Sequence, residues 1–245
     1  MLDNPDPNPA PRLRDALASP ETKRRYVRRL FSTIADRYDL ITAVLSYGQD
    51  RRWKQRLTEL AAAGPATQAL DLACGTGDIA FSLARRGARV VGLDITHRMV
   101  QIARGKRGVP AVDFVTGDMM ALPFGDATFD LVTTGYGIRN VPGIGQALAE
   151  MHRVLKPGGV LLSLDFNRPV NPAVRAVYLA YLTVVGSALG FVLHRDPDTY
   201  RYIPESIRRY PGAIQVNALI LQHGFRESEY RPVLFGLMAI HHARK

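Results

Sequence analysis

The residues whose types most clearly suggest a chemical role are two carboxylates on either side of a glycine-rich turn. An apolar run ends at Asp71, and Gly75 and Gly77 follow it, just before a segment with helical periodicity. This order predicts a strand, a tight turn and a helix, in which the glycines let the backbone approach a ligand closely. A second apolar run ends at Asp94, roughly 20 residues beyond the glycines, where a carboxylate that binds ribose hydroxyls is expected.

Two details of the turn bear on which ligand it binds. Asp78 stands where the helix begins, and a carboxylate there opposes a pyrophosphate group, which binds bare helix N-termini. Asp71 at the strand end suits a ligand that carries an ammonium group. S-adenosylmethionine has an ammonium, a sulfonium and a ribose diol, so the pattern favours this cofactor. NAD(P) and a turn that serves only packing are the alternatives.

The composition limits the class of protein. With 245 residues, of which 47% are hydrophobic, the chain can form one large domain or one domain with a lid. Its single cysteine, Cys74, excludes an intrachain disulfide, fits a reducing compartment and is interpreted as a small apolar filler. The first residues form no apolar stretch, so we expect no signal peptide and a cytoplasmic location. The net charge of +10 predicts attraction to nucleic acid or to an anionic membrane surface, without choosing between them.

Alternating strands and helices predict an α/β fold. Fully apolar strands between helices indicate a mostly parallel, doubly wound sheet. The strand candidates are Gln68–Leu72, Ala88–Asp94, Val112–Thr116, Phe129–Thr134 and Val160–Phe166, with Phe225–Arg231 and Val233–His242 as an antiparallel edge. The helix candidates between them are Asp78–Arg86, Thr96–Lys106 and Ile144–Leu155, and a turn is predicted at Lys156-Pro157-Gly158-Gly159.

The patterns divide the chain into three parts. Residues 1–20 are rich in Pro, Asp, Asn and Ala and are predicted to form a flexible tail. Residues 21–64 form a helical segment whose pattern breaks at Arg37-Tyr38-Asp39. Residues 65–245 form the main domain, with a lid insertion at about residues 170–210.

Two helical patterns allow several interpretations. Residues 22–34 place apolar side chains on one face and basic ones on the other, which fits a solvated helix, a surface for anionic lipid headgroups or a surface for nucleic acid. Ala176–Leu193 has 18 residues without a charge, which reaches the length of a membrane span. Tyrosines and glycines dilute this run, and the strands predicted after it belong to the same sheet. We therefore favour a helix that roofs an apolar pocket over a membrane span or an ordinary core helix.

Several blocks of the sequence resemble the ubiquinone/menaquinone-biosynthesis C-methyltransferases. These blocks are Asp71–Asp78, Gly117–Phe124, Gly137–Val141, Arg153–Gly159 and Tyr200–Ile207, with Tyr38-Asp39, Leu45–Gly48 and Trp53-Lys54 upstream. The resemblance covers about residues 26–245. The chain departs from the family pattern at Gly135, where many members have Ser, at Thr42, where Asn is common, and at Asp165-Phe166-Asn167, which replaces Glu-Phe-Ser. These departures leave the exact quinone open.

The resemblance implies a Rossmann-like class I S-adenosylmethionine-dependent methyltransferase, with a mostly parallel seven-stranded sheet, an antiparallel edge strand and a helical lid. It implies methylation of a ring carbon of a polyprenyl quinol, of the demethylmenaquinone or methoxy-benzoquinol type, in menaquinone or ubiquinone biosynthesis. Its motifs place Thr76, Asp94, Asp118 and Met119 at the family's cofactor positions. The full set that we predict to bind the cofactor is Asp71, Gly75, Thr76, Gly77, Asp94, Ile95, Asp118, Met119 and Gly135. We predict that Tyr38, Tyr136, Tyr200, Tyr202 and Ser206 bind the substrate.

The family match assigns substrate activation to Arg139 and Asn140. They follow the fourth predicted strand, and ligands bind beyond the carboxyl ends of strands in open α/β sheets. An arginine side chain stays protonated, with a pKa above about 12, so a fixed cation that lowers the pKa of the quinol hydroxyl is favoured over a literal base. Water then accepts the proton, and Asn140 holds that water. The reaction needs no metal, and the histidines are not spaced as a metal site.

Three other functions remain as alternatives. A methyltransferase of another small molecule or lipid shares the cofactor motifs. A nucleic-acid methyltransferase is favoured only by the charge, because Gly135–Arg139 replaces the usual Asn/Asp-Pro-Pro-aromatic block and the only cysteine lies elsewhere. The intact glycines and carboxylates oppose a non-catalytic quinone- or cofactor-binding subunit. We therefore expect a quinol and, transiently, an anionic membrane surface as partners, and no nucleic acid; a homodimer is left open.

Overall fold

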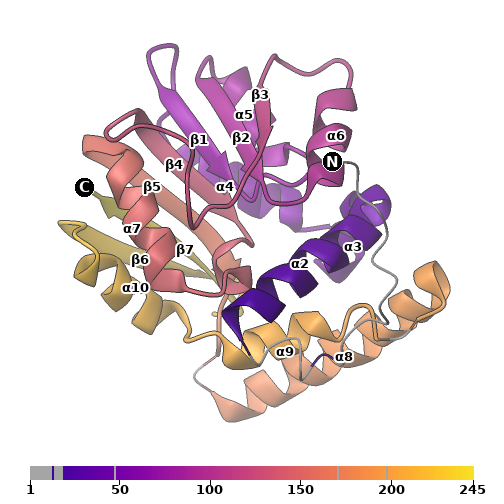
Figure 1. Cartoon of the computed structure of the whole chain (residues 1–245). Helices are drawn as coiled ribbons and strands as arrows, with labels where there is room; N and C mark the ends of the chain where they lie inside the picture. The colour runs from indigo at the N-terminus through magenta and orange to yellow at the C-terminus, as the bar shows by residue number, and fades with distance from the viewer. Residues whose placement is uncertain (1–12, 14–18, 47, 170, 197) are drawn as a thin grey trace.

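The computed structural model, which describes residues 13, 19–46, 48–169, 171–196 and 198–245, is built on a seven-stranded sheet in the order β3-β2-β1-β4-β5-β7-β6 (Figure 1). The strands are β1 Gln68–Leu72, β2 Arg89–Asp94, β3 Asp113–Thr116, β4 Phe129–Gly135, β5 Leu155–Phe166, β6 Glu227–Val233 and β7 Met238–Arg244. The first five strands run parallel, and β7 is antiparallel to both β5 and β6. The sequence prediction of a mostly parallel sheet with an antiparallel edge pair is confirmed.

Helices cover both faces of the sheet because its central strands are apolar on both sides. Leu70 belongs to a cluster that includes residues of two helices, and Leu131 belongs to a second cluster that includes residues of three others. The first two helices are α7 Ile144–Val154 and α10 Ala213–Gln222, and the other three are α4 Asp50–Leu60, α5 Asp78–Arg85 and α6 His97–Gly105. Burying a leucine side chain of this kind contributes about 1.5–3 kcal/mol. The two clusters therefore hold the sheet edge that carries the candidate site.

The glycine-rich turn between β1 and α5 has the conformation that its sequence predicts. Gly77 ends the turn with φ 90°, in the left-handed region that side chains disfavour. A Cβ atom at this position would lie 2.7 Å from the ring of Phe81 and 2.9 Å from the ring of Phe114. Only glycine fits here without moving two packed aromatic rings.

The predicted turn at Lys156–Gly159 is wrong, because the structure places these residues inside β5. β5 starts at Leu155, directly after α7 ends. Its register with β4 jumps from the pair Phe129–Leu155 to the pair Leu131–Val160, so the extra residues form an irregularity within the strand. Gly158, with φ 78°, supplies the bend that the prediction interpreted as a turn.

The helical segment before the sheet differs from the prediction at one point. It contains α2 Pro20–Ile34, a short 3-10 helix η1 Ala35–Arg37, α3 Tyr38–Leu45 and α4. The expected break at Arg37-Tyr38-Asp39 is confirmed, because α2 ends at Ile34 and Arg37 leaves the helical region with φ −116° and ψ 6°. The pattern does not predict α3, which starts directly at Tyr38 and buries Ile41 against Tyr200 and residues of α8. Ser19 caps α2 through a capping box with Thr22. The predicted tail lies outside the described residues, apart from residues 13, 19 and 20.

The insertion that we predicted as a lid contains two helices, which lie along one end of the sheet. α8 spans Pro172–His194 and is capped by Asn171, whose side chain accepts hydrogen bonds from the first turn. α9 spans Tyr202–Arg209. Figure 1 shows α2, α9 and α8 beside one another below the sheet, with α8 outermost. The helix α2, which precedes the sheet, and the helices α8 and α9, which follow β5, therefore lie at the same end of the sheet.

Candidate active site

A cavity of about 70 Å³ lies beside the glycine-rich turn, between the ends of β1, β2 and β4 and the helix α2. Six of the residues predicted to bind the cofactor line it: Gly75, Asp94, Ile95, Asp118, Met119 and Gly135. Asp71 and Thr76 line a smaller neighbouring cavity of about 20 Å³. Gly77 instead forms the N-cap of α5. The structure therefore brings most of the predicted cofactor residues together around one space.

Asp94 holds the turn in shape from the end of β2. Its Oδ2 accepts a hydrogen bond from the N–H of Gly75 at 2.9 Å, and its Oδ1 accepts one from the N–H of Thr96 at 2.8 Å. Burial raises the pKa of Asp94 above its ordinary value, although these two hydrogen bonds act in the opposite direction. Each carboxylate oxygen keeps a further acceptor site, so Asp94 can also accept hydrogen bonds from a ligand.

Asp71 is fully buried and bonded within the chain. Its Oδ1 accepts a hydrogen bond from the hydroxyl of Thr133 at 2.8 Å, and its Oδ2 accepts one from the N–H of Ala80 at 3.1 Å. Burial raises the pKa of Asp71 to about 7, although both hydrogen bonds lower it. Asp71 therefore links β1 to β4 and to the start of α5, and these hydrogen bonds do not depend on a bound ligand.

The helix α2 covers the first cavity. Val27 and Phe31 on its inner face line the cavity, and Arg24 forms an ion pair with Asp118 across its rim at 2.8 Å. From the same helix, Lys23 Nζ donates hydrogen bonds to the backbone oxygens of Arg139 and Val141, at 3.2 and 2.6 Å. The apolar face of this basic helix thus packs inward and is not free for lipid acyl chains.

A second cavity, of about 630 Å³, lies between the N-terminal helices and the lid. Its lining is largely apolar and comes from α2, α3, α4, α8, α9 and the β6–β7 connection. Four of the predicted substrate residues line it: Tyr38, Tyr136, Tyr200 and Tyr202. The prediction that the apolar run of α8 roofs an apolar pocket is consistent with this lining, because Val174, Val177, Tyr178 and Tyr181 contribute to it.

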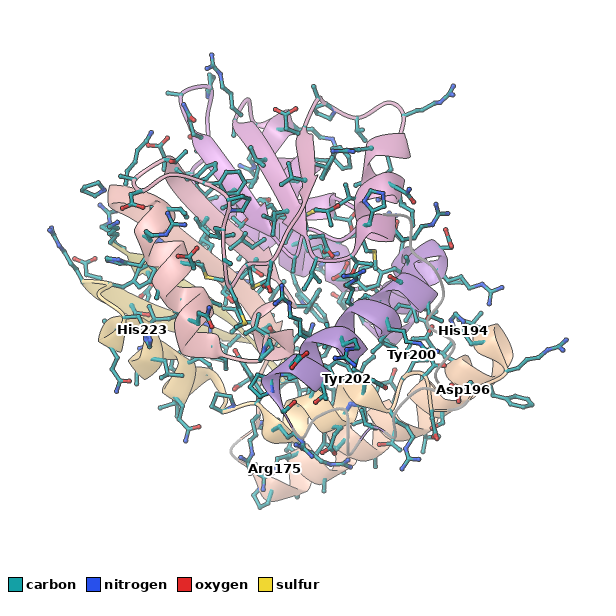
Figure 2. All side chains as sticks on the ribbon, viewed as in Figure 1. Arg175, His194, Asp196, Tyr200, Tyr202 and His223 are labelled. Atoms are coloured by element: carbon teal, nitrogen blue, oxygen red, sulfur yellow. The ribbon has the colours of Figure 1, made fainter. Side chains whose placement is uncertain are left out.

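The two cavities share part of their walls. Phe31, Tyr38 and Tyr136 line both. Figure 2 shows Tyr202 and Tyr200 in the region between α2 and α8, and the hydroxyl of Tyr200 lies 2.8 Å from His194 Nε2. The wall that the two cavities share is therefore formed by aromatic side chains.

Arg139 lies at the wall of the large cavity in a buried ion pair. Its Nη1 donates to Asp165 Oδ1 at 2.6 Å, and its backbone N–H donates to Asp165 Oδ2 at 3.1 Å. Its guanidinium stacks on the ring of Phe166, 4.5 Å from the ring centre. Burial alone would lower the pKa of Arg139, but the attraction of Asp165 raises it above its ordinary value. Arg139 is therefore a permanent cation, and its Nε has no hydrogen-bond partner among the described residues.

Asn140 faces the small cavity and fixes two neighbours. Its Nδ2 donates to the backbone oxygen of Tyr136 at 2.8 Å, and its Oδ1 accepts a hydrogen bond from the hydroxyl of Tyr202 at 3.0 Å. Ser206 lies elsewhere: it lines a third cavity, of about 280 Å³, with Lys23 and with Arg139. Its hydroxyl donates to the backbone oxygen of Ile203 within α9. The structure therefore does not bring Ser206 into the large apolar cavity.

Sequence reasoning misses three charged residues of the site. Asp165 stands out in the sequence only as a departure from the family, Lys54 only as part of a block that the family shares, and Asp50 resembles an ordinary surface charge. The side chain of Asp50 is buried, that of Lys54 is 11% exposed, and the two form an ion pair at 2.7 Å. Asp50 shares a helical face with Trp53 and Leu57, and this spacing is a signal that it points inward.

The thiol of Cys74 and the side chains of metal-ligating types have ordinary surroundings in the part of the chain that the structure describes. Burial raises the pKa of the Cys74 thiol well above its ordinary value, so it stays protonated and fits the role of a small apolar filler. Among the described residues, no group of three or more His, Cys, Asp or Glu side chains is arranged to hold a metal ion.

The fold and the turn with its carboxylates define a class I S-adenosylmethionine-dependent methyltransferase. The model of the ubiE/COQ5 methyltransferase family matches residues 19–245. The chain belongs to this family.

Named relatives and solved structures agree with this assignment. The chain is 39% identical to the ubiquinone/menaquinone biosynthesis C-methyltransferase UbiE of Dinoroseobacter shibae, over 90% of this chain and 91% of the relative. It is 42% identical to the demethylmenaquinone methyltransferase of Thermus thermophilus, over 86% and 98%. Its fold is similar to that of a solved S-adenosylmethionine-dependent methyltransferase from Thermotoga maritima, a possible histamine N-methyltransferase, with a TM-score of 0.65 and 19% identity over 89% of this chain and 99% of that one.

We expect the buried Asp71 to make stability depend on pH. Because its pKa is raised to about 7 in the folded chain, the folded state binds more protons than the unfolded state between about pH 4 and 7. The stabilisation is complete at low pH and is lost as the pH rises through 7. The free energy of unfolding of the wild type, measured with urea, should fall over this range relative to that of Asp71→Asn. A difference in the free energy of unfolding between the wild type and Asp71→Asn that does not change with pH would contradict this prediction.

Proposed function

We propose that the chain transfers the methyl group of S-adenosylmethionine to a ring carbon of a polyprenyl quinol, in menaquinone or ubiquinone biosynthesis. The observation that carries the proposal is the large apolar cavity, which shares an aromatic wall with the cavity beside the glycine-rich turn. A quinol ring with an isoprenoid tail has the apolar character of this lining. The names of the relatives, which concern menaquinone and ubiquinone biosynthesis, support the same substrate class.

The residues around the small cavity fit S-adenosylmethionine in their chemistry. Asp94 offers carboxylate oxygens for ribose hydroxyls, and the space beside Gly75 is open, because a Cβ atom there would meet only the ring of Tyr38 within 4 Å. The cavity of about 70 Å³ is smaller than the ~300–1,000 Å³ of typical ligand sites. We infer that α2 moves outward when the cofactor enters, and that its contacts Arg24–Asp118 and Lys23–Val141 then break and re-form.

The sulfonium of this cofactor supplies an activated methyl group, so the task of the chain is to raise the electron density of the ring carbon. Arg139 can do this by stabilising negative charge on the quinol oxygen. Arg139 lines the large cavity, which places its guanidinium beside a bound ring, and its Nε has no partner in the part of the chain that the structure describes. Asp165 compensates part of its charge, so we assign Arg139 the role of an oriented donor rather than that of an isolated cation.

Asn140 supports the same site by holding its neighbours. Its bonds to Tyr202 and to the Tyr136 carbonyl fix one residue from the lid and one from the loop after β4. We therefore propose that Asn140 positions the aromatic wall, in place of the water-holding role that the sequence suggested.

Each of the three predicted segments of the chain has its own role in this proposal. We propose that residues 21–64 close the cofactor site, that residues 65–245 form the methyltransferase domain, and that the insertion at about residues 170–210 encloses the quinol. The supporting observation is that α2, α3, α8 and α9 all line the large cavity.

We propose that the outer face of the lid contacts an anionic membrane surface from the cytoplasmic side. α8 is long and apolar enough to span a membrane, yet only 17% of its apolar window is buried in the structure. Its exposed apolar residues are Val174, Val177, Val184, Phe191 and Val192. Phe235, in the β6–β7 connection, is 98% exposed, and its neighbour Leu234 lines the large cavity. A lipid-tailed quinol can enter the cavity from this face.

The charges near α8 favour contact with a surface over a span. Arg168 and Arg175 lie at its first end, and Arg37 bonds to the backbone of Leu193 at its last turn. The strands β6 and β7, which follow α8, pair within the same sheet as β5, which precedes it. One crossing would place these partners on opposite sides of the bilayer.

The substrate proposal is tested by following labelled methyl groups. We expect the purified protein to transfer them from S-adenosylmethionine to a reduced demethylmenaquinone or to the corresponding demethylated benzoquinol. Other phenolic and lipid acceptors, offered at equal concentration, should react at least about 100-fold more slowly. Preferred transfer to one of those acceptors would replace the quinol with the alternative, a methyltransferase of another small molecule or lipid.

Asp94→Ala should weaken the binding of S-adenosylmethionine. Loss of hydrogen bonds to a carboxylate costs about 1.5–3 kcal/mol, which corresponds to at least a tenfold rise in Kd by calorimetry. Asp113→Ala, an exposed carboxylate at the opposite end of the neighbouring strand β3, is the matched control and should leave the Kd unchanged. Unchanged affinity in a folded Asp94→Ala would remove Asp94 from the cofactor site.

Arg139→Lys should keep cofactor affinity but lose about 10²–10³ in the rate of single-turnover methyl transfer. Lysine preserves the charge beside Asp165. It lacks the planar guanidinium that can donate hydrogen bonds to the Asp165 carboxylate and to the quinol oxygen at the same time. Arg139→Ala should lose as much and also destabilise the fold by about 3–5 kcal/mol, because it leaves Asp165 buried without its partner.

The control for Arg139 is Arg98→Lys, an exposed residue paired with Asp36, which should react like the wild type. The rate of the Arg139 variants should recover at high pH, where the quinol ionises without help. A near-normal rate for Arg139→Lys at neutral pH would contradict the assignment.

Phe235→Asn should weaken binding to vesicles that contain anionic lipid by about tenfold, because it removes an aromatic ring that packs on little else. The backbone at Phe235 has φ 53°, which asparagine tolerates better than phenylalanine, so stability should not fall. Ile214→Ser, an exposed apolar residue on α10, is the matched control and should bind like the wild type.

The effect of salt on vesicle binding distinguishes contact with the membrane surface from insertion of a helix into the membrane. Each basic residue near an anionic surface adds about 1 kcal/mol, which salt screens. Sedimentation with vesicles should therefore fall in high salt and with neutral lipid alone. Binding that resists salt and carbonate would favour a membrane span.

A further inference from the structure

Tyr136 and Asp50 form a buried hydrogen bond beside both cavities. Tyr136 Oη donates to Asp50 Oδ1 at 2.7 Å, and the two residues are 7% and 6% exposed. The ring of Tyr136 belongs to the wall that the large and small cavities share. A phenol bonded to a buried carboxylate thus lies where the acceptor ring must approach the methyl donor.

The backbone at Tyr136 is held in an unusual conformation. Its φ of 61° lies in the left-handed region, which bulky residues rarely adopt. Its N–H donates to the oxygen of Leu164 at 2.7 Å, and its carbonyl accepts hydrogen bonds from Arg139 and Asn140 at 3.1 and 2.8 Å. Strained residues that are fixed from several sides in this way are concentrated at functional sites. The loop therefore keeps the phenol of Tyr136 aimed at Asp50.

The surroundings of Asp50 leave one oxygen for this phenol. Its Oδ2 pairs with Lys54 Nζ at 2.7 Å, and Lys54 also pairs with Asp78 at 2.9 Å. Burial alone would lower the pKa of Lys54, but these two carboxylates raise it above its ordinary value. Lys54 therefore stays charged and occupies Oδ2, while Oδ1 faces Tyr136.

We propose that Tyr136 and Asp50 take the proton of the quinol hydroxyl, an inference that rests on the quinol methylation proposed above. The O–H bond of the quinol breaks and its proton bonds to Tyr136 Oη, while the proton of Tyr136 moves to Asp50 Oδ1. The electron pair stays on the quinol oxygen and enriches the ring carbon. One negative charge thus moves from Asp50 to the quinol oxygen, which Arg139 stabilises. Tyr136 is neutral before and after the step, and no free water is needed as the acceptor.

The first test compares Tyr136→Phe, Asp50→Asn and the double variant in single-turnover methyl transfer to a demethylmenaquinol. Each single variant should lose about 10²-fold at neutral pH, the scale of general acid–base catalysis. The double variant should be no slower than the slower single one, because the two residues act as one unit. Asp50→Glu should restore at least about tenfold over Asp50→Asn. Tyr230→Phe and Asp126→Asn, changes outside both cavities, are the controls and should react like the wild type.

The second test needs no turnover. 2-Naphthol, a phenol that absorbs differently when ionised, is titrated by absorbance in the presence of excess protein without cofactor. At neutral pH a fraction of the bound naphthol should absorb as naphtholate in the wild type, because its proton passes through Tyr136 to Asp50, and this fraction should be absent in Tyr136→Phe. A wild type whose bound naphthol absorbs only as the neutral phenol at neutral pH would overturn the relay, whether or not any variant folds.

The outcomes also separate this inference from the proposed function. If the wild type methylates no quinol, the proposed function fails, while the naphthol titration still decides on the proton relay. If the wild type methylates the quinol but the folded single variants keep rates within about threefold, the relay is wrong. Additive losses in the double variant would likewise contradict it, because independent structural damage adds and a shared relay does not.

Discussion

The ion pair between Arg139 and Asp165 fixes the loop that follows β4. Nη1 of Arg139 lies 2.6 Å from Asp165 Oδ1, and both side chains are almost completely buried. Removal of either partner leaves a buried charge unpaired, at a cost of about 3–5 kcal/mol. Asp165 belongs to β5, which lies between β4 and β7 in the sheet, so the pair transfers the rigidity of the sheet to the loop. The wall between the two cavities depends on this loop, because Tyr136 and Asn140 both belong to it.

This constraint produces two spaces with different chemistry. The space beside the glycine-rich turn has carboxylates and backbone groups that suit a polar cofactor. The larger space is apolar and suits a ring with an isoprenoid tail. Arg139 is the only charged side chain among the described residues that line the larger space, and the ring of Tyr136 lines the same space. The helix α2 lines both spaces and α8 lines the larger one. In the proposed reaction these helices exclude water, which strengthens the electrostatic effects of the buried groups.

The local parts of this arrangement are well predicted from the sequence. The strand, turn and helix around Gly75 and Gly77 follow from residues that are neighbours in the chain, and so does the carboxylate at the end of β2. Asp50 and Asp165 are missed because their roles arise from contacts with Tyr136 and Arg139, 86 and 26 positions away. The inward packing of α2 is not predicted either. Its pattern is the same for a helix on lipid and for a helix on protein, and only the tertiary fold decides between them.

In the proposed function, the quinol ring lies in the apolar cavity, between Tyr136 and Arg139, and its reacting carbon faces the methyl donor. A crystal structure with S-adenosylhomocysteine and a demethylated quinol tests this most directly. We predict the sulfur in the cavity beside Asp94, the ring in the larger cavity, and a quinol oxygen within hydrogen-bonding distance of Arg139. A ring bound outside this cavity, or one whose oxygens face only apolar side chains, would contradict the claim.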